Sequence, residues 1–379
     1  MNFDLNEEQK MLQKMVREFT EKEVAHLDEK MDKSGEFPYE LMKKLADNGF
    51  YGIPYAEKYG GAGGDELSGA LTLMELAKGS MSVAFTLATH WVPANALNNF
   101  GTEEQKQKYL VPMLTGEKLG AFALTEPGAG SDSAGIVSTG TADEDVWVLN
   151  GNKVFITNGG VSDIYVICVK TDKTKGAKGI SAFIVEKGTP GFSIGKKEDK
   201  MGCRGSSTTE LIMKDCRVPK ENMIGNEGEG FKIAMSILEK GRMAFGALGI
   251  GISEACLSVA KKYANERQAF GKPIASFQAI QFIIANMAME IELSKALLQK
   301  VASMYEKGEK CGTEAAMLKV FTSEMAMKAA KDAIQVLGGY GYTRDYPPER
   351  YLRDAKFLEI AEGANEVLRF VIGSTILRG

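Results

Sequence analysis

The sequence is poor in the residue types that build most metal centres and hydrolase active sites. It has two histidines, His26 and His90, and five cysteines, none of which belongs to a C-x-x-C pair. Zinc sites draw on His and Cys at short spacing, and a Ser-His-Asp triad needs a His as its base. The composition therefore argues against a metal site and against triad hydrolases. Carboxylates, hydroxyls, backbone amides or a bound cofactor are left to carry the chemistry.

Long apolar runs and an excess of one charge are also missing. No stretch of about 18 consecutive apolar residues occurs, so we expect no transmembrane helix. Lys and Arg number 46 against 50 Asp and Glu, which gives no basic footprint for nucleic acid. The acidic residues 1–8 resemble neither a signal peptide nor a transit peptide. With its scattered, odd number of cysteines, the chain is expected to be a reduced, cytoplasmic protein that binds neither membrane nor nucleic acid.

The first third of the chain has the spacing of helices. Asn6 and Gln9 form a capping pair before a run of apolar residues at helical spacing, and Thr102 and Gln105 form a capping box. Further helices are predicted at about 39–48, 66–78 and 82–98, with a glycine-rich break at 59–64. We therefore expect an N-terminal α-helical domain over residues 1–119.

The middle of the chain changes to the spacing of strands. Two short apolar runs flank Asn150-Gly151, which is a strong β-hairpin pattern. Further strands are predicted at 164–169, 180–185, 192–195 and 209–213. The pattern predicts an antiparallel barrel-like or sandwich-like domain over residues 120–228.

From Gly230 onward the spacing is helical again. Four long helices are predicted at about 230–264, 276–307, 313–337 and 347–372. Their short connections favour a four-helix bundle over residues 229–379. The fold class is thus α+β, with helical domains before and after a β domain.

Three segments before the C-terminus have the composition of ligand-binding segments. The loop 122–132 is rich in Gly and small residues and offers the hydroxyls of Thr125 and Ser131, but it has neither phosphate-loop spacing. Phe155 and Thr157 stand at a strand end, where a ring and a hydroxyl suit a planar ligand. Arg267 ends a helix and could pair with a phosphate. Each segment alone has a purely structural alternative: a surface loop, a strand entering a turn, and a charge that complements a helix C-terminus.

The C-terminal segment 360–367 places Glu362 before Gly363 and between Ala361 and Ala364. Small neighbours leave room for a ligand to approach this carboxylate closely. A buried carboxylate with a raised pKa can abstract a proton, although a solvated carboxylate at a helix end is the commoner case.

Taken together, these segments carry a family resemblance. The chain resembles the acyl-CoA dehydrogenases, and is most similar to the short-chain, butyryl-CoA-type enzymes of anaerobic bacteria, over essentially its whole length. The resemblance rests on the segments 124–132, 155–160, 200–202, 218–222, 267–272 and 335–339 and on the Glu362-Gly363 corner.

The resemblance implies an FAD-dependent enzyme in which Glu362 removes the α-proton of an acyl-CoA while the β-hydride passes to flavin N5. The thioester carbonyl would be polarised by the Glu362 N–H and a flavin ribityl hydroxyl. Substrate-binding positions implied by the family are Ser131, Arg242, Gly363 and Ala361. Flavin-binding positions implied by the family are Phe122, Leu124, Thr125, Phe155 and Thr157, and, towards a neighbouring subunit's cofactor, Arg267, Phe270, Gln278, Gln335, Gly338 and Gly339. Glu366 matches a further position near the adenosine.

Several positions differ from the usual family pattern or distinguish its branches. Some members carry the base at the position of Gly241, which cannot serve here. Ala361 replaces an aromatic residue, Ala364 replaces a Thr, and Glu239 replaces an Asp. Ala361 motivates the hypothesis of an acyl group bulkier than butyryl, branched, aryl-substituted or longer. The alternative is that another side chain, such as Trp91, fills the space.

The resemblance further implies an electron-transferring flavoprotein as partner and a homotetramer built as a dimer of dimers. It leaves the direction open, because an enoyl-CoA reductase would use the same residues in reverse. Two rival functions are an oxidase-like flavoenzyme that passes electrons to oxygen, or a related monooxygenase, and a non-catalytic binding protein with a decayed flavin site.

Overall fold

The computed structural model describes residues 4–378, and its N-terminal region is helical as predicted. Asn6 and Gln9 form the expected capping box at the start of α1, and Thr102 and Gln105 form that of α6. The helices of this region are α1 (Glu7–Phe19), α2 (Asp28–Ser34), α3 (Tyr39–Asp47), α4 (Glu66–Gly79), α5 (Met81–Phe100), α6 (Glu103–Gln105) and α7 (Val111–Leu114).

The middle region is one eight-stranded sheet in the order β6-β7-β3-β2-β4-β5-β8, with β1 beside β4. Most neighbours are antiparallel, while β1 and β2 each pair with β4 in parallel. The strands are β1 (Gly120–Ala123), β2 (Thr139–Asp143), β3 (Val146–Thr157), β4 (Ile164–Lys170), β5 (Ile180–Glu186), β6 (Phe192–Lys197), β7 (Thr208–Pro219) and β8 (Met223–Ile224).

The hairpin predicted at Asn150-Gly151 is wrong. Strand β3 runs straight through both residues, and its pairing with β7 shifts register between Leu149 and Gly151, which marks a β-bulge. The chain turns earlier, between β2 and β3, where Glu144 adopts a φ of 48°. An Asn-Gly pair suits both a tight turn and a bulge, and the β7 partner of β3 comes from far along the chain.

The C-terminal region is the expected helical bundle, but its last predicted helix is broken. Instead of one helix at 347–372, α11 (Pro348–Lys356) and a 3-10 turn, η11 (Phe357–Glu359), precede α12 (Asn365–Arg378). The interruption falls at Glu362 and Gly363, whose φ angles are 55° and 96°. The other elements are α8 (Gly230–Glu266), the two-residue strands β9 (Gln268–Ala269) and β10 (Lys272–Pro273), α9 (Gln278–Glu306) and α10 (Gly312–Leu337).

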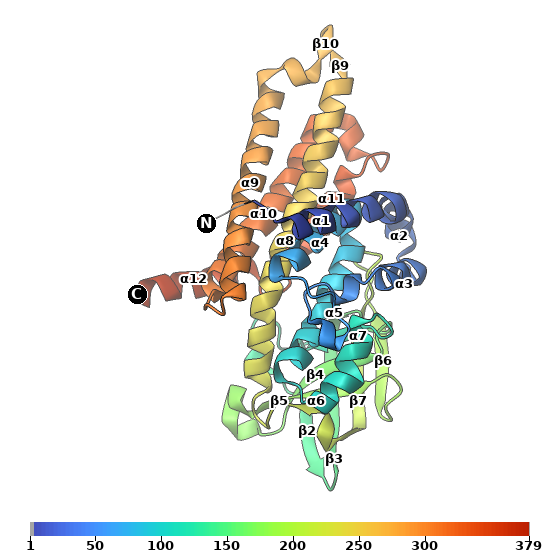
Figure 1. Ribbon diagram of the computed structural model, residues 1–379, viewed down its shortest axis with the longest axis vertical. Coiled ribbons are helices and arrows are strands. Elements are labelled where there is room, and N and C mark those ends of the chain that lie inside the picture. Colours follow the sequence, from blue (N-terminus) through green and yellow to red (C-terminus); the bar gives the residue numbers. More distant parts are fainter. Residues whose placement is uncertain (1–3, 379) are drawn as a thin grey trace.

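Helix α8 is the central element of the molecule. It has an apolar stretch long enough to cross a membrane, but 72% of that stretch is buried inside the protein, as in a core helix. One large cluster of buried apolar side chains includes Leu73 of α4, Leu87 of α5, Leu248 of α8 and Leu318 of α10, so the two helical regions share a core. Figure 1 shows the β region at one end of the long helices and the β9–β10 turn at the other. The domain boundaries at 119/120 and 228/229 remain predictions.

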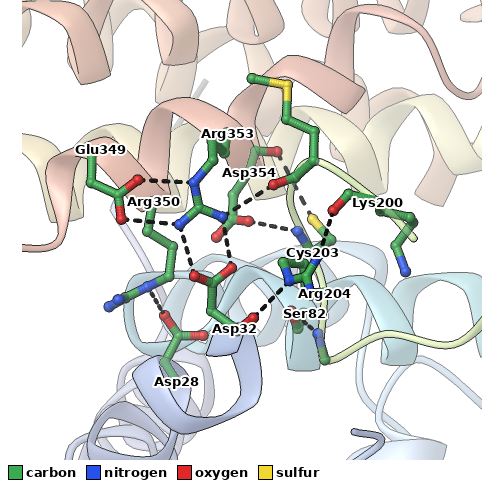
Figure 2. A network of polar contacts seen from close by, with 12 residues as sticks. Asp28, Asp32, Ser82, Lys200, Cys203, Arg204, Glu349, Arg350, Arg353 and Asp354 are labelled. Carbon is green, nitrogen blue, oxygen red and sulfur yellow. Dashed lines mark hydrogen bonds and ion pairs between the residues drawn. The ribbon is translucent and has the colours of Figure 1, made fainter. Parts of the chain in front are cut away.

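A polar network fixes α11, the element that leads into the Glu362 corner (Figure 2). Arg353 binds Asp32 through two hydrogen bonds of 2.7 Å, and Arg350 binds Asp28 at 2.6 Å. The backbone N–H of Cys203 donates to Asp354 at 2.6 Å. A Cβ at Gly202 would lie 2.4 Å from the Arg353 carbonyl oxygen, so the close approach of the 200–202 segment requires glycine. The N-terminal, middle and C-terminal regions therefore meet at α11.

Candidate active site

Glu362 sits at the corner between η11 and α12 and is half-buried. The N–H groups of Ile360 and Ala361 both donate to the Phe357 carbonyl, which closes the turn before it. Burial raises the pKa of Glu362 to about 7, while the positive charges of Arg242 and Lys319 act in the opposite direction. A carboxylate with this pKa can take up and release a proton near neutral pH.

The Glu362 carboxylate lies directly against Gly241 of α8. A Cβ at position 241 would be 2.4 Å from Oε1 and 3.0 Å from Cδ. The glycine thus provides the space that the carboxylate occupies, and no competing acid stands at that position. The role of Glu362 as the base remains a prediction.

Next to Gly241, Arg242 is half-buried, and its Nε is buried without a hydrogen-bond partner among the described residues. The hydroxyl of Tyr305 is likewise buried and unpartnered in the described part of the chain. Burial raises the pKa of Tyr305, and the charge of Arg242 acts in the opposite direction. Buried polar atoms of a native protein normally have partners, so these atoms are suited to meet a polar ligand. The geometry is compatible with the predicted role of Arg242 in substrate binding.

Two of the predicted flavin segments are held side by side. The buried ammonium of Lys153 on β3 donates to the Leu124 carbonyl at 3.0 Å and to Glu126 at 2.7 Å, and the Val154 N–H donates to the Thr125 carbonyl at 3.0 Å. Burial alone would raise the pKa of Glu126, but the charge and hydrogen bond of Lys153 hold it below its ordinary value. Nothing in the sequence pattern singles out Lys153, because a lysine in a strand is ordinarily exposed.

The face built by these segments fits a planar aromatic cofactor. Phe155 of β3 adopts a φ of 58° and leaves 65% of its side chain exposed, whereas the next residue, Ile156, is buried. Thr157 is half-buried at the strand end, and Thr208, which pairs with it, has a buried hydroxyl without a partner in the described chain. Phe122 and Thr125 are half-buried and Leu124 is buried beneath them. An exposed ring can stack on the face of a planar ligand, and a hydroxyl without a partner can hydrogen-bond to its edge.

This face is linked to the Glu362 corner through α5. The side chain of Asn158, in the turn after Thr157, donates to the Thr86 carbonyl at 3.0 Å. The adjacent Phe85 packs against Phe357 of η11, with 4.4 Å between the ring centroids. The middle region and the acid–base corner are therefore positioned by the same helix.

The remaining predicted cofactor residues lie elsewhere. Arg267 and Phe270 are at the β9–β10 turn, at the far end of the molecule from the β region (Figure 1). Phe270 is 95% exposed, and Gln335, Gly338 and Gly339 lie where α10 ends. Gln278 begins α9, Glu366 is exposed on α12, and Ser131 is exposed in its loop. All these roles remain predictions. Ser131 is predicted to bind the substrate and Glu366 to lie near the adenosine, while the others are predicted to reach the cofactor of a second subunit.

A small cavity extends from Gly241 between α4, α5 and α8. It has about 30 Å³ of free volume, and its walls include Ala88, Trp91 and Val92. The Trp91 indole N–H donates to the Tyr51 carbonyl at 2.7 Å, which fixes the ring. Ala361 is half-buried against the large core cluster and does not line this cavity. The cavity therefore does not decide between the two explanations of Ala361, and both remain predictions.

Lys319 of α10 is a second site residue that the sequence did not indicate. Its ammonium donates to the Gly363 carbonyl, immediately after Glu362, at 2.7 Å. Helical spacing marks position 319 as part of a buried face, where a lysine is unexpected.

Comparisons with known proteins point to one family. Family models described as the acyl-CoA dehydrogenase N-terminal, middle and C-terminal domains match residues 6–117, 121–216 and 228–377. The short-chain specific acyl-CoA dehydrogenase of Clostridium acetobutylicum is 48% identical over 100% of both chains. The butyryl-CoA dehydrogenase structure from Megasphaera elsdenii has a TM-score of 0.98 at 46% identity over 100% of both chains. A chain in the structural study of the electron transferring flavoprotein of Acidaminococcus fermentans has a TM-score of 0.99 at 48% identity, again over 100% of both.

Proposed function

The chain belongs to the acyl-CoA dehydrogenase family, and on this premise we propose that it interconverts short-chain acyl-CoA and 2-enoyl-CoA thioesters with Glu362 as the acid–base residue. It is an FAD-dependent oxidoreductase acting on CH–CH bonds. The observation that carries the assignment of the base is the half-buried Glu362 carboxylate over Gly241, with a pKa of about 7.

When bound, FAD supplies the hydride acceptor or donor. We assign its ring to the face formed by Phe122, Leu124, Thr125, Phe155 and Thr157. In a tetramer, the exposed residues of the β9–β10 turn and of the α10 end would reach the cofactor of a neighbouring subunit. This arrangement gives a purpose to Phe270, which one subunit leaves 95% exposed.

The protein's own part in the reaction is proton transfer and polarisation. In the oxidative direction Glu362 takes the α-proton, and in the reductive direction it returns that proton. Its own N–H makes no hydrogen bond to any other described residue, so it is free to donate to the thioester carbonyl. Arg242 would bind a polar part of CoA through its unpartnered Nε.

The cavity supports a short acyl chain. Once the α- and β-carbons lie between Glu362 and the flavin, the acyl end would meet the small cavity beyond Gly241, whose walls include Ala88, Trp91 and Val92. The fixed ring of Trp91 would obstruct a bulky acyl end there. We therefore infer a butyryl-sized substrate rather than an aryl-substituted one.

We further propose a homotetramer that exchanges electrons with an electron-transferring flavoprotein in the cytoplasm. Anaerobic mixing of the two flavoproteins, followed by visible spectroscopy, tests the electron exchange. Unchanged spectra would remove this partner. A stoichiometric yield of peroxide in air would instead support the oxidase-like alternative, and a purified protein without yellow flavin absorbance would support the non-catalytic one.

The reaction itself is tested by anaerobic titration of the purified protein with butyryl-CoA. We expect the flavin absorbance to bleach in the wild type. The Glu362→Gln variant should retain its FAD and bleach at least about 100-fold more slowly, the usual contribution of a general base. Glu309→Gln, at an exposed glutamate, is the matched control. Bleaching of Glu362→Gln at the wild-type rate would overturn the assignment of the base, and a wild type that no short-chain acyl-CoA bleaches would overturn the reaction.

A further inference from the structure

Lys319 is a buried cation without a direct counter-ion. Its residue is 1% exposed, and it forms no ion pair within 4.0 Å with any residue from 4 to 378. Taking an ammonium out of water is costly unless its charge is compensated. A lysine kept in such a place calls for an explanation from its surroundings.

The ammonium holds the segment that follows the base. It donates to the Gly363 carbonyl at 2.7 Å and to the Asn365 side-chain oxygen at 3.0 Å. One turn further along α10, Ser323 accepts a hydrogen bond of 3.0 Å from the Asn365 side-chain nitrogen. Helix α10 thus anchors both residues that frame the turn into α12. Because Glu362 is a non-glycine residue at positive φ, its conformation has to be maintained by such contacts.

The charge of Lys319 also reaches Glu362. Burial lowers the pKa of Lys319 to about 8, and the Glu362 carboxylate is the strongest of the charges that counteract this. The charge of Arg242 on α8 lowers the pKa of Lys319 further. Glu359 of η11 and Glu366 of α12 raise it, as Glu362 does. In turn, Lys319 and Arg242 favour the ionised form of Glu362. The positive charge of Lys319 and the negative charge of Glu362 therefore stabilise each other.

We propose that Lys319 is a positioning residue for the acid–base step: it fixes the corner that carries Glu362, and its charge favours the carboxylate form of Glu362. This inference rests on the proposed role of Glu362. The two roles can be separated by experiment. Loss of the hydrogen bonds from Lys319 should lower the rate at every pH, whereas loss of its charge should change the pH at which Glu362 titrates.

Three variants separate these effects. Lys319→Met removes donor and charge, Lys319→Gln keeps a donor but removes the charge, and Asn365→Ala removes one anchor and leaves the charge. Lys328→Met, at a half-exposed lysine of the same helix that pairs with Glu290, is the control. FAD content and tetramer mass are measured first for each variant, so that a folding defect is recognised.

The readout is the pH dependence of kcat/KM for butyryl-CoA oxidation. In Lys319→Gln and Lys319→Met the acid limb should move up by roughly one pH unit, which lowers kcat/KM about tenfold at pH 6 and little at pH 8.5. Asn365→Ala should lower kcat at every pH without moving the limb. An unmoved limb in a folded Lys319→Gln enzyme would overturn the charge role, and a wild-type rate in Asn365→Ala would overturn the anchoring role.

A measurement without turnover keeps this test distinct from that of the proposed function. The carboxyl infrared band of Glu362, identified as the band that Glu362→Gln lacks, is titrated in ¹³C-glutamate-labelled holoenzyme. Its midpoint should rise in Lys319→Gln whether or not butyryl-CoA is the substrate. If Lys319→Met does not fold, Lys319→Gln carries the test. If neither variant yields holoenzyme, Lys319 is required for folding and the positioning role is overturned.

Discussion

The carboxylate of Glu362 occupies the space that any side chain at position 241 would need. Glu362 lies at a corner before the last helix and Gly241 lies within α8, yet a Cβ on Gly241 would be only 2.4 Å from Glu362 Oε1. Real Cβ atoms do not approach an oxygen so closely, so one of the two groups would have to move. The position of the base is therefore set by a glycine far away in the sequence.

Gly241→Ala should impair catalysis through Glu362 alone. The added methyl group displaces the carboxylate, and a misplacement of about 1 Å typically costs on the order of 100-fold in rate. We expect kcat for butyryl-CoA to fall by about that factor while FAD binding is unchanged, as measured by steady-state kinetics and flavin absorbance. Gly373→Ala is the control, because this helical glycine has nothing within 4 Å of its Cβ position. A Gly241→Ala enzyme with wild-type kcat would show that the carboxylate lies elsewhere in the working enzyme.

The pH dependence of the two directions should be opposite. Oxidation needs ionised Glu362, whose pKa is raised to about 7, so kcat/KM should fall about tenfold per pH unit below pH 7. Enoyl-CoA reduction needs the protonated form, so its kcat/KM should fall above pH 7. Both profiles are measured with an artificial redox dye, and the reaction of pre-reduced enzyme with the dye over the same pH range is the control. An acid limb near pH 4.5 would contradict the raised pKa.

The sequence predicted regular elements well and the corner poorly. The helices and most strands follow from apolar spacing and capping residues, such as Asn6 with Gln9. The same spacing continues from α11 into α12, so it predicted a single helix across Glu362. The break depends on Lys319, which binds the Gly363 carbonyl from another helix. No local pattern encodes such a contact.

Sequence motifs indicate the acid–base and flavin residues, whereas the residues that support them depend on the fold. Glu362, Phe155 and Thr157 belong to segments with a recognisable order of residues, so they could be named in advance. Lys153 and Lys319 lie within a strand and a helix, and both donate hydrogen bonds to carbonyl groups distant in the sequence, while Lys153 also pairs with Glu126. As lysines, both side chains would ordinarily be expected on the exposed surface. Buried lysines bonded to carbonyls are recognised only once the fold brings the partners together.

Trp91 should limit the length of the acyl chain. Its ring forms part of the wall of the cavity beyond Gly241, so Trp91→Leu should let longer chains enter. One methylene group in an apolar pocket is worth about 10-fold or more in specificity. We therefore expect the ratio of kcat/KM for hexanoyl-CoA over butyryl-CoA to rise at least about tenfold. Trp147→Leu, which removes a buried tryptophan from the β region, is the control. If the ratio of kcat/KM for hexanoyl-CoA over butyryl-CoA is the same in Trp91→Leu as in the wild type, the acyl chain binds in another part of the molecule.

Asp354 should make the holoenzyme less stable as the pH rises. Burial, followed by the nearby charge of Asp28, raises the pKa of Asp354 to about 8. In the unfolded chain an Asp titrates near 3.9, so between about pH 4 and pH 8 the folded protein holds a proton that the unfolded chain releases. The contribution of protonated Asp354 is therefore complete below pH 4 and is lost as the pH rises through 8.

Asp354→Asn mimics the protonated state at every pH and keeps an oxygen for the Cys203 N–H. At pH 5 the variant and the wild type should have similar melting temperatures. At pH 8 the variant should be the more stable, by an amount on the order of 2–4 kcal/mol, since each pH unit contributes at most about 1.4 kcal/mol. Scanning calorimetry of the FAD-loaded proteins at pH 5, 6.5 and 8 measures the difference. Asp47→Asn, at an exposed aspartate, should follow the wild type throughout. If Asp354→Asn were instead destabilised equally at all three pH values, Asp354 would be ionised in the folded protein, and the network in Figure 2 would depend on that negative charge.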